Sequence, residues 1–146
     1  MTTNIFTIGF TKKTAARFFG LLKETGVKRV IDTRLKRASQ LAGFAKEQDL
    51  PFLLRELCSA DYLKEPLLAP TAEMLSAYKK KSIDWNAYER EFLGLIKSRE
   101  IEKKLSPQLL DHGCLLCSED KPHFCHRRLI AEYLKERWPA VVVRHL

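Results

Sequence analysis

The first 33 residues contain an apolar strand, an amphipathic helix and a second apolar strand. Residues 5–9 read Ile-Phe-Thr-Ile-Gly, and residues 27–33 read Val-Lys-Arg-Val-Ile-Asp-Thr. Between them, four apolar residues recur at the spacing of one helix face: Ala15, Phe18, Phe19 and Leu22. This order of elements predicts a βαβ unit, which implies a parallel pair of strands and a right-handed crossover.

The end of the chain repeats the alternation of strand and helix. Residues 113–117 form a short apolar run, and from His123 apolar residues recur at helical spacing up to residue 138. Three valines at 141–143 indicate a final buried strand. We therefore predict one α/β domain over residues 1–146, a three-layer sandwich with a mainly parallel sheet of four or five strands.

The middle of the chain is harder to assign. Residues 45–50 suggest a short helix, and the apolar run Pro51-Phe52-Leu53-Leu54 suggests a third strand. Two further helices are predicted over residues 71–81 and from Asp84 onward, each with a capping residue at its start. We interpret the aromatic stripe of the second helix as core packing.

The composition, 45% hydrophobic and 30% charged, is typical of a soluble globular protein. We expect no signal peptide, no membrane contact and a cytoplasmic location. In the cytoplasm the four cysteines are expected to stay reduced and to bind metal, react or pack in the core. The net charge of +8 favours an anionic ligand or nucleic acid, although a solvated basic surface explains it equally well. No cofactor motif is visible, and the oligomeric state is not indicated.

The stretch 113–128 gathers most of the reactive side chains. It contains seven residues of interest: Cys114, Cys117, Glu119, Cys125, His126, Arg127 and Arg128. The helical spacing places Cys125 and His126 in a first turn above the end of the strand that carries Cys117. In an open α/β sheet, ligands bind at this edge, where the strands have their carboxyl ends.

A second polar group follows the strand at residues 27–33. Asp32 and Arg34 stand at the end of this strand, and a basic connection with Lys36, Arg37 and Ser39 comes next. An aspartate at a strand end is usually a turn or cap residue. The neighbouring cations favour a loop that faces an anion, with Arg34, Lys36, Arg37, Ser39 and Arg128 as anion-binding candidates.

These motifs resemble one known family. The Ile8-Gly9 opening, the D-x-R strand end at residues 32–34, the C-x-E turn at 117–119 and the C-H-R run at 125–127 occur in the order of the uncharacterised bacterial and archaeal domain-of-unknown-function family 488. The resemblance implies the fold and marks site residues, but no settled activity. The chain departs from the family pattern in lacking a proline shortly after Arg34, and a tyrosine and a histidine within residues 52–57.

The first hypothesis is an enzyme that acts on a phosphorylated or nucleic-acid-related substrate. A helix N-terminus and the adjacent His126 and Arg127 favour the thiolate form of Cys125. Asp32 and Glu119 can act as general acid or base. The candidate catalytic residues are Asp32, Arg34, Cys117, Glu119, Cys125, His126 and Arg127. The alternative is a buried Cys125 and a His126 that is satisfied by a carboxylate.

Two other hypotheses remain open. A metal-binding protein would use Cys117, Glu119, Cys125 and His126, which zinc accepts. Cys114 and Cys117 point to opposite faces of a strand, however, so no closed zinc knuckle is predicted and no metal ligand is assigned. A non-catalytic nucleic-acid or nucleotide-binding module fits the charge, but no stretch interleaves aromatic and basic residues as a single-strand-binding face does.

Overall fold

The computed structural model describes residues 2–37, 43–119 and 121–146. Within these residues the strands are β1 (Thr3–Gly9), β2 (Arg29–Asp32), β3 (Asp61–Lys64), β4 (Gly113–Cys117) and β5 (Val141–His145). The α-helices are α1 (Ala15–Glu24), α2 (Leu50–Cys58), α3 (Ala72–Lys79), α4 (Trp85–Ser98), α5 (Ile101–Lys104), α6 (Pro107–Leu110) and α7 (His126–Arg137). Two short 3-10 turns are η1 (Gly43–Ala45) and η2 (Pro66–Leu68).

The five strands form one parallel sheet in the order β3-β2-β4-β1-β5. The predicted parallel sheet is confirmed, and all of its strand pairs are parallel. β1 and β2 are not neighbours, however, because β4 lies between them. Every residue of β4 is buried, which explains its central place: a strand that is apolar on both faces must be covered by helices on both sides.

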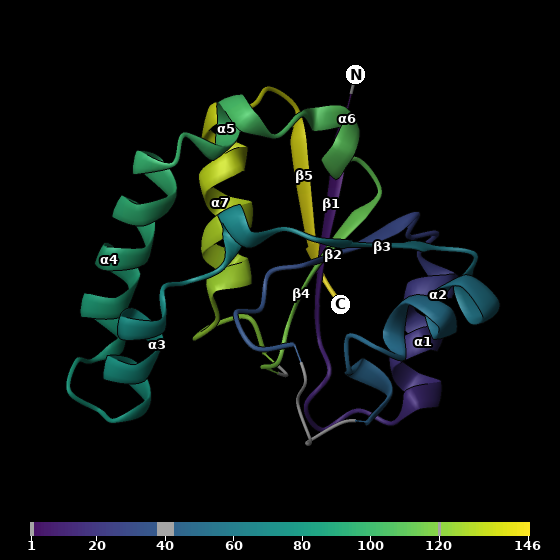
Figure 1. Cartoon of the computed structure of the whole chain (residues 1–146). Coiled ribbons are helices and arrows are strands. Elements are labelled where there is room, and N and C mark those ends of the chain that lie inside the picture. Colours follow the sequence, from purple (N-terminus) through teal and green to yellow (C-terminus); the bar gives the residue numbers. More distant parts are fainter. Residues whose placement is uncertain (1, 38–42, 120) are drawn as a thin grey trace.

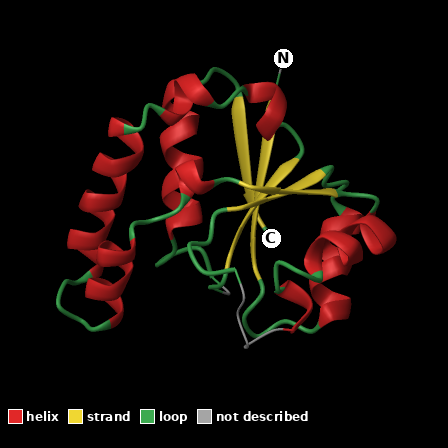
Figure 2. Ribbon diagram, viewed as in Figure 1, coloured by secondary structure: helices red, strands yellow, loops and turns green. Residues whose placement is uncertain are grey.

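Helices cover both faces of the sheet and make three layers, as Figures 1 and 2 show. On one face α1 and α2 pack on Phe6, Ile8, Val30 and Leu116. On the other face α7 packs on the sheet, and α4 lies against the outer side of α7. In the part of the chain that is described, no helix has both the length and the apolar character needed to cross a bilayer.

Four elements differ from the sequence prediction. β5 is not a buried strand, because it lies at an edge of the sheet and Val142 is exposed. Residues 46–49, predicted as part of a helix over 45–50, form a turn between η1 and α2.

The run Pro51–Leu54 is not a strand but the first part of α2, with Pro51 near its N-terminus and Leu50 and Leu54 buried on one face. A short apolar run fits a strand and a buried helix face equally well, which is why this prediction was wrong. The third strand is instead β3, at an edge of the sheet. α7 begins at His126 rather than at residue 123, because Cys125 is extended and forms the N-cap.

The carboxyl ends of β1, β2 and β4 lie side by side. The register pairs Gly9 with Cys117 and Asp32 with Leu116. The segments that follow these strands therefore leave the sheet at the same edge, below the start of α7. This arrangement places the D-x-R strand end next to the C-x-E turn.

The close approach of β1 to this turn requires a glycine at its end. A Cβ atom on Gly9 would overlap the backbone carbonyl of Glu119 and the guanidinium Nη1 of Arg127. Backbone cannot move aside as a flexible side chain does. Gly9 therefore sets how closely the β4–α7 turn packs on β1.

We expect Gly9→Ala to lower the free energy of unfolding by about 3 kcal/mol or more, because the added methyl group overpacks a site bounded by backbone. Chemical denaturation monitored by circular dichroism measures this change. Gly94→Ala is the matched control: a Cβ there meets no heavy atom within 4 Å, so this variant should keep or slightly raise stability. Equal stability of the two variants would contradict the proposed contact.

Candidate functional site

A pocket of about 680 Å³ lies at the carboxyl ends of β1, β2 and β4. One part of its wall comes from the segments that leave these strands, with Phe10, Arg34 and residues 117–119. The other part comes from α3, α4 and the turn before α7. The volume is within the range of small-molecule sites, and the position is the one at which open α/β sheets bind ligands.

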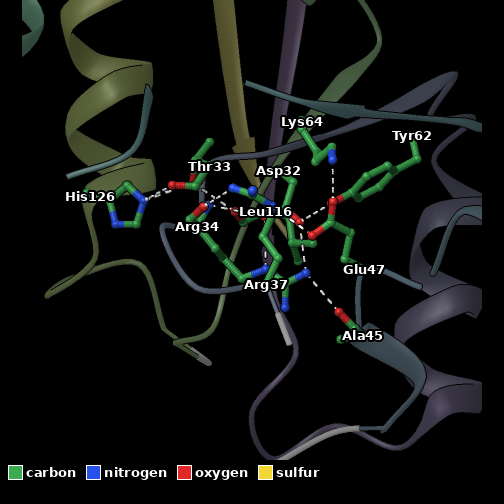
Figure 3. A network of polar contacts seen from close by, with 10 residues as sticks. All are labelled: Asp32, Thr33, Arg34, Arg37, Ala45, Glu47, Tyr62, Lys64, Leu116 and His126. Carbon is green, nitrogen blue, oxygen red and sulfur yellow. Dashed lines mark hydrogen bonds and ion pairs between the residues drawn. The ribbon is translucent and has the colours of Figure 1, made fainter. Parts of the chain in front are cut away.

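Asp32 and Arg34 form a buried ion pair (Figure 3), and Arg34 also lines the pocket. Oδ1 of Asp32 accepts hydrogen bonds from the Arg34 backbone N–H at 3.1 Å and from its Nε at 2.9 Å. Oδ2 accepts from Nη2 of Arg34 at 2.8 Å and from the Tyr62 hydroxyl at 2.5 Å. Asp32 is 1% exposed, so its carboxylate holds Arg34 in place and is not open to a ligand.

Tyr62 completes the coordination of this carboxylate from the neighbouring strand β3. Burial, together with the hydrogen bond to Asp32, raises the pKa of Tyr62, so its hydroxyl stays protonated and donates. Sequence reasoning missed this residue because it had placed the third strand elsewhere. A tyrosine beside Asp32 is a consequence of the β2–β3 pairing.

One nitrogen of the Arg34 guanidinium has no hydrogen-bond partner among the described residues. Nε and Nη2 bind Asp32, and Nη2 also donates to the carbonyl of Ala45 at 2.8 Å. Among the described residues, Nη1 of Arg34 is buried and has no hydrogen-bond partner. Leaving a buried charged donor unpaired costs about 1–3 kcal/mol or more, so this nitrogen is an unusual feature of a residue that lines the pocket.

His126 lies at the start of α7 and is held by Thr33. Its Nε2 is 2.9 Å from both the carbonyl oxygen and Oγ1 of Thr33. The carbonyl can only accept, so Nε2 carries the proton, and Oγ1 donates in turn to the carbonyl of Leu116 at 2.8 Å. In the neutral ring Nδ1 is then an acceptor. The predicted alternative of a satisfied histidine is correct, but its partner is Thr33 and not a carboxylate.

Burial lowers the pKa of His126 to about 4. The nearby Arg127 guanidinium acts in the same direction, while the hydrogen bond to Thr33 and the Asp32 charge act against it. The imidazole is therefore neutral at pH 7. It lines the pocket as an uncharged polar group.

Arg127 is a fully buried residue that fixes the β4–α7 turn. Its Nη1 donates to the backbone carbonyl of Glu119 and approaches Sγ of Cys117 at 3.3 Å. The guanidinium also lies against Gly9, as described above. Arg127, a candidate catalytic residue in the sequence analysis, thus supports the pocket from behind and is absent from its described lining.

The expectation of reduced cysteines was wrong for one pair, since Cys117 and Cys125 form a disulfide. β4 places Cys117 on the sheet face that α7 covers, and Cys125 is the N-cap residue directly above it. In this form neither sulfur is a nucleophile, and neither is free to bind zinc. Cys114 is buried on the opposite face, as expected from its spacing, and burial raises the pKa of its thiol. Across the described residues, no group of three or more His, Cys, Asp or Glu side chains is arranged to hold a metal ion.

An aromatic cluster forms the wall opposite the strand ends. Trp85 stacks on Tyr88 with ring centroids 5.3 Å apart and meets Tyr78 and Phe124 edge-on at 5.7 and 5.5 Å. Phe124 is 62% exposed, an unusual state for a phenylalanine. Sequence reasoning assigned the stripe of α4 to the core. Tyr88 is indeed buried, but both Trp85 and Tyr88 also line the pocket.

Cations surround the same pocket. Lys36, Arg37 and Lys79 line it together with Arg34. Arg37 donates to Glu47 at 3.1 Å, and Lys64 pairs with the same carboxylate, which lowers the pKa of Glu47. Of the other two predicted anion-binding residues, only Arg128 can be placed. Ser39 lies outside the described residues, and Arg128 pairs with Glu89 and Glu132 away from the described lining.

One family profile matches this chain. Described as domain of unknown function DUF488, it covers residues 14–134, which include β2, β4 and most of α7. The chain belongs to the DUF488 family. No curated protein and no solved structure matches it. In this DUF488 protein the D-x-R, C-x-E and C-H-R segments are thus adjacent parts of one pocket wall.

We expect the stability of this DUF488 protein to fall as the pH drops from about 6.5 to about 4 because of His126. Its pKa is lower in the folded chain than the usual 6.5, so over this window the unfolded chain binds a proton that the folded chain does not. The loss is at most about 1.4 kcal/mol per pH unit for one group. Denaturation at a series of pH values should show this slope reduced in His126→Gln. An NMR titration that gives the His126 imidazole a pKa above 6.5 would contradict this prediction.

Proposed function

We propose that this protein binds a nucleotide-type ligand, that is, one with a planar ring and a negatively charged group, in the pocket at the strand ends. One observation carries the proposal: the aromatic cluster around Trp85 and the cations around Arg34 line the same cavity. The sequence separates these two groups, which explains why no mixed aromatic and basic stretch was visible.

The aromatic wall suits a ring. Trp85 and Phe124 meet at 66°, so a flat ligand can stack on one of them and contact the edge of the other. Stacking of a nucleobase on an aromatic side chain contributes about 1–3 kcal/mol and does not depend on base identity. Phe124 is already exposed, so no rearrangement is needed to offer this surface.

The cations suit the negative part of the ligand. Arg34, Lys36, Arg37 and Lys79 line the pocket, against one carboxylate of the described lining, Glu119. A cavity with one sign of charge raises the local concentration of ligands of the opposite sign. A net charge of +8 for the whole chain acts in the same direction. A cytoplasmic location, where nucleotides and single-stranded RNA are abundant, is part of the proposal.

The two tryptophans of the chain allow a direct test of binding. In Trp138→Phe, Trp85 is the remaining tryptophan and reports on the pocket. We expect saturable quenching of its fluorescence by nucleoside monophosphates, because stacking brings the base onto the indole. In Trp85→Phe, the remaining Trp138 is 9% exposed and donates to the carbonyl of Glu102, so its fluorescence should not respond.

Trp85→Ala should weaken binding about 10- to 100-fold, measured by calorimetry, because it removes one stacking surface. No saturable signal from any of the four nucleoside monophosphates or from short single-stranded RNA would refute the proposal. An equal response of both tryptophan variants would place binding outside the pocket and refute it as well.

A second candidate function is catalysis on the same ligand. The observation that favours it is the pair of Glu119 and neutral His126 in the pocket lining. A carboxylate can act as a general base, and the acceptor Nδ1 of His126 can orient a hydroxyl or water. The disulfide makes a Cys125 nucleophile unavailable in this form, which leaves Glu119 in the role of general base.

If the protein is an enzyme, we expect Glu119→Gln to lower the turnover rate about 100-fold or more. Ligand binding should still quench the fluorescence of Trp85 in this variant. Chromatography of nucleotides and short RNA after incubation with the protein measures the turnover. Glu136→Gln, an exposed carboxylate on α7, serves as the control. If the wild type leaves every compound of this panel intact, binding alone is the function.

A further inference from the structure

Arg34 lines the pocket, and one nitrogen of its guanidinium is buried without a hydrogen-bond partner among the described residues. Arginine has five N–H donors. Three of them are committed inside the protein: Nε to Asp32, and the two of Nη2 to Asp32 and to the Ala45 carbonyl. The two N–H groups of Nη1 are left, and within the described residues no partner accepts from them. Arg34 is 5% exposed and lines the pocket, so bulk water does not supply these acceptors freely.

The surroundings hold this nitrogen in a fixed position. The Tyr62 hydroxyl and the Arg34 backbone both bind the Asp32 carboxylate, so the anchor is itself held from two strands. The ring of Phe10 lies 5.4 Å from Cζ on another side of the guanidinium. Such a pre-organised donor loses little conformational freedom when a ligand binds.

The charge around Arg34 matches a doubly charged anion. The described cations that line the pocket or pair with its wall are Arg34, Lys36, Arg37, Lys64 and Lys79. The corresponding carboxylates are Asp32, Glu47 and Glu119. Five cations against three carboxylates leave a surplus of two positive charges. A phosphate monoester carries close to two negative charges at neutral pH and offers several acceptor oxygens.

We propose that Arg34 Nη1 marks a phosphate-monoester subsite, so that the ligand is a nucleoside monophosphate or a strand with a terminal phosphate rather than a nucleoside. This inference rests on the proposed function, because it assigns the two ends of the same pocket. The ring lies at Trp85 and Phe124, and the phosphate accepts hydrogen bonds from Nη1 of Arg34. Lys36 and Arg37 supply the remaining charge at the rim.

The test compares adenosine with adenosine 5′-monophosphate on Trp138→Phe, with Trp85 as the reporter. We expect the monophosphate to bind about 10- to 100-fold more tightly, since charge-assisted hydrogen bonds to Arg34 exist only with the phosphate. Arg34→Gln in this background should abolish that preference and leave the affinity for adenosine within about twofold. The 5′-diphosphate is the third ligand, and it should gain little over the monophosphate, because the phosphate next to its ribose carries an anhydride bond and only one negative charge.

Two controls separate binding from folding. Arg144→Gln removes the same charge from an exposed position on β5 and should keep the preference for the monophosphate. If Arg34→Gln fails to fold by circular dichroism, Tyr62→Phe replaces it. This variant loses only the hydroxyl that holds Asp32, so it should reduce the preference for the monophosphate without changing adenosine binding. A purely structural tyrosine would weaken both ligands equally.

The outcomes distinguish this inference from the proposed function. Equal affinity of the wild-type pocket for adenosine and its monophosphate overturns the phosphate subsite and leaves ring binding intact. A monophosphate preference that survives in folded Arg34→Gln, or in Tyr62→Phe where that variant replaces it, also overturns it and assigns the phosphate to the cations at the rim. If neither ligand quenches Trp85, the proposed function fails together with the inference.

Discussion

The central place of β4 determines the rest of this structure. A strand whose residues are all buried needs a neighbour on each side and a helix layer on each face. β4 therefore separates β1 from β2, although these two strands are joined by a single helix. As a result, the segments after Gly9, Asp32 and Cys117 leave the sheet at one edge. The pocket exists because three strand ends, far apart in sequence, are forced to share this edge.

Two arginines are buried at this edge, and each is there for a different reason. A buried ion pair such as Asp32–Arg34 contributes little net stability, because desolvation of both charges offsets their attraction. The main effect of this pair is that the Asp32 carboxylate orients the Arg34 guanidinium. Arg127 is also fully buried, but its Nη1 binds the Glu119 backbone carbonyl and so positions the turn. One arginine therefore faces the pocket, while the other supports its wall.

Sequence reasoning found one wall of the site and missed the other. The D-x-R and C-x-E segments were predictable neighbours, because carboxyl ends of parallel strands meet at one edge of a sheet. The aromatic wall was not, since Trp85 and Tyr88 fall on an ordinary amphipathic stripe, and only the position of α4 brings both of them to the pocket. The disulfide between Cys117 and Cys125 was equally hidden, because it depends on the exact start of α7.

The turn between β4 and α7 contributes both polar and apolar groups to the pocket, and its anchoring explains how it can do so. Ser118 accepts from the backbone N–H of Thr11 at 3.0 Å, Glu119 is held by Arg127, and the disulfide joins the two ends of the turn. Glu119 and Phe124 therefore project from a fixed backbone although both side chains are exposed. A ligand that meets a fixed backbone pays less conformational entropy than one that must order a loop. The buried arginine and the close packing on β1 thus fix the backbone at Glu119, although its side chain is exposed.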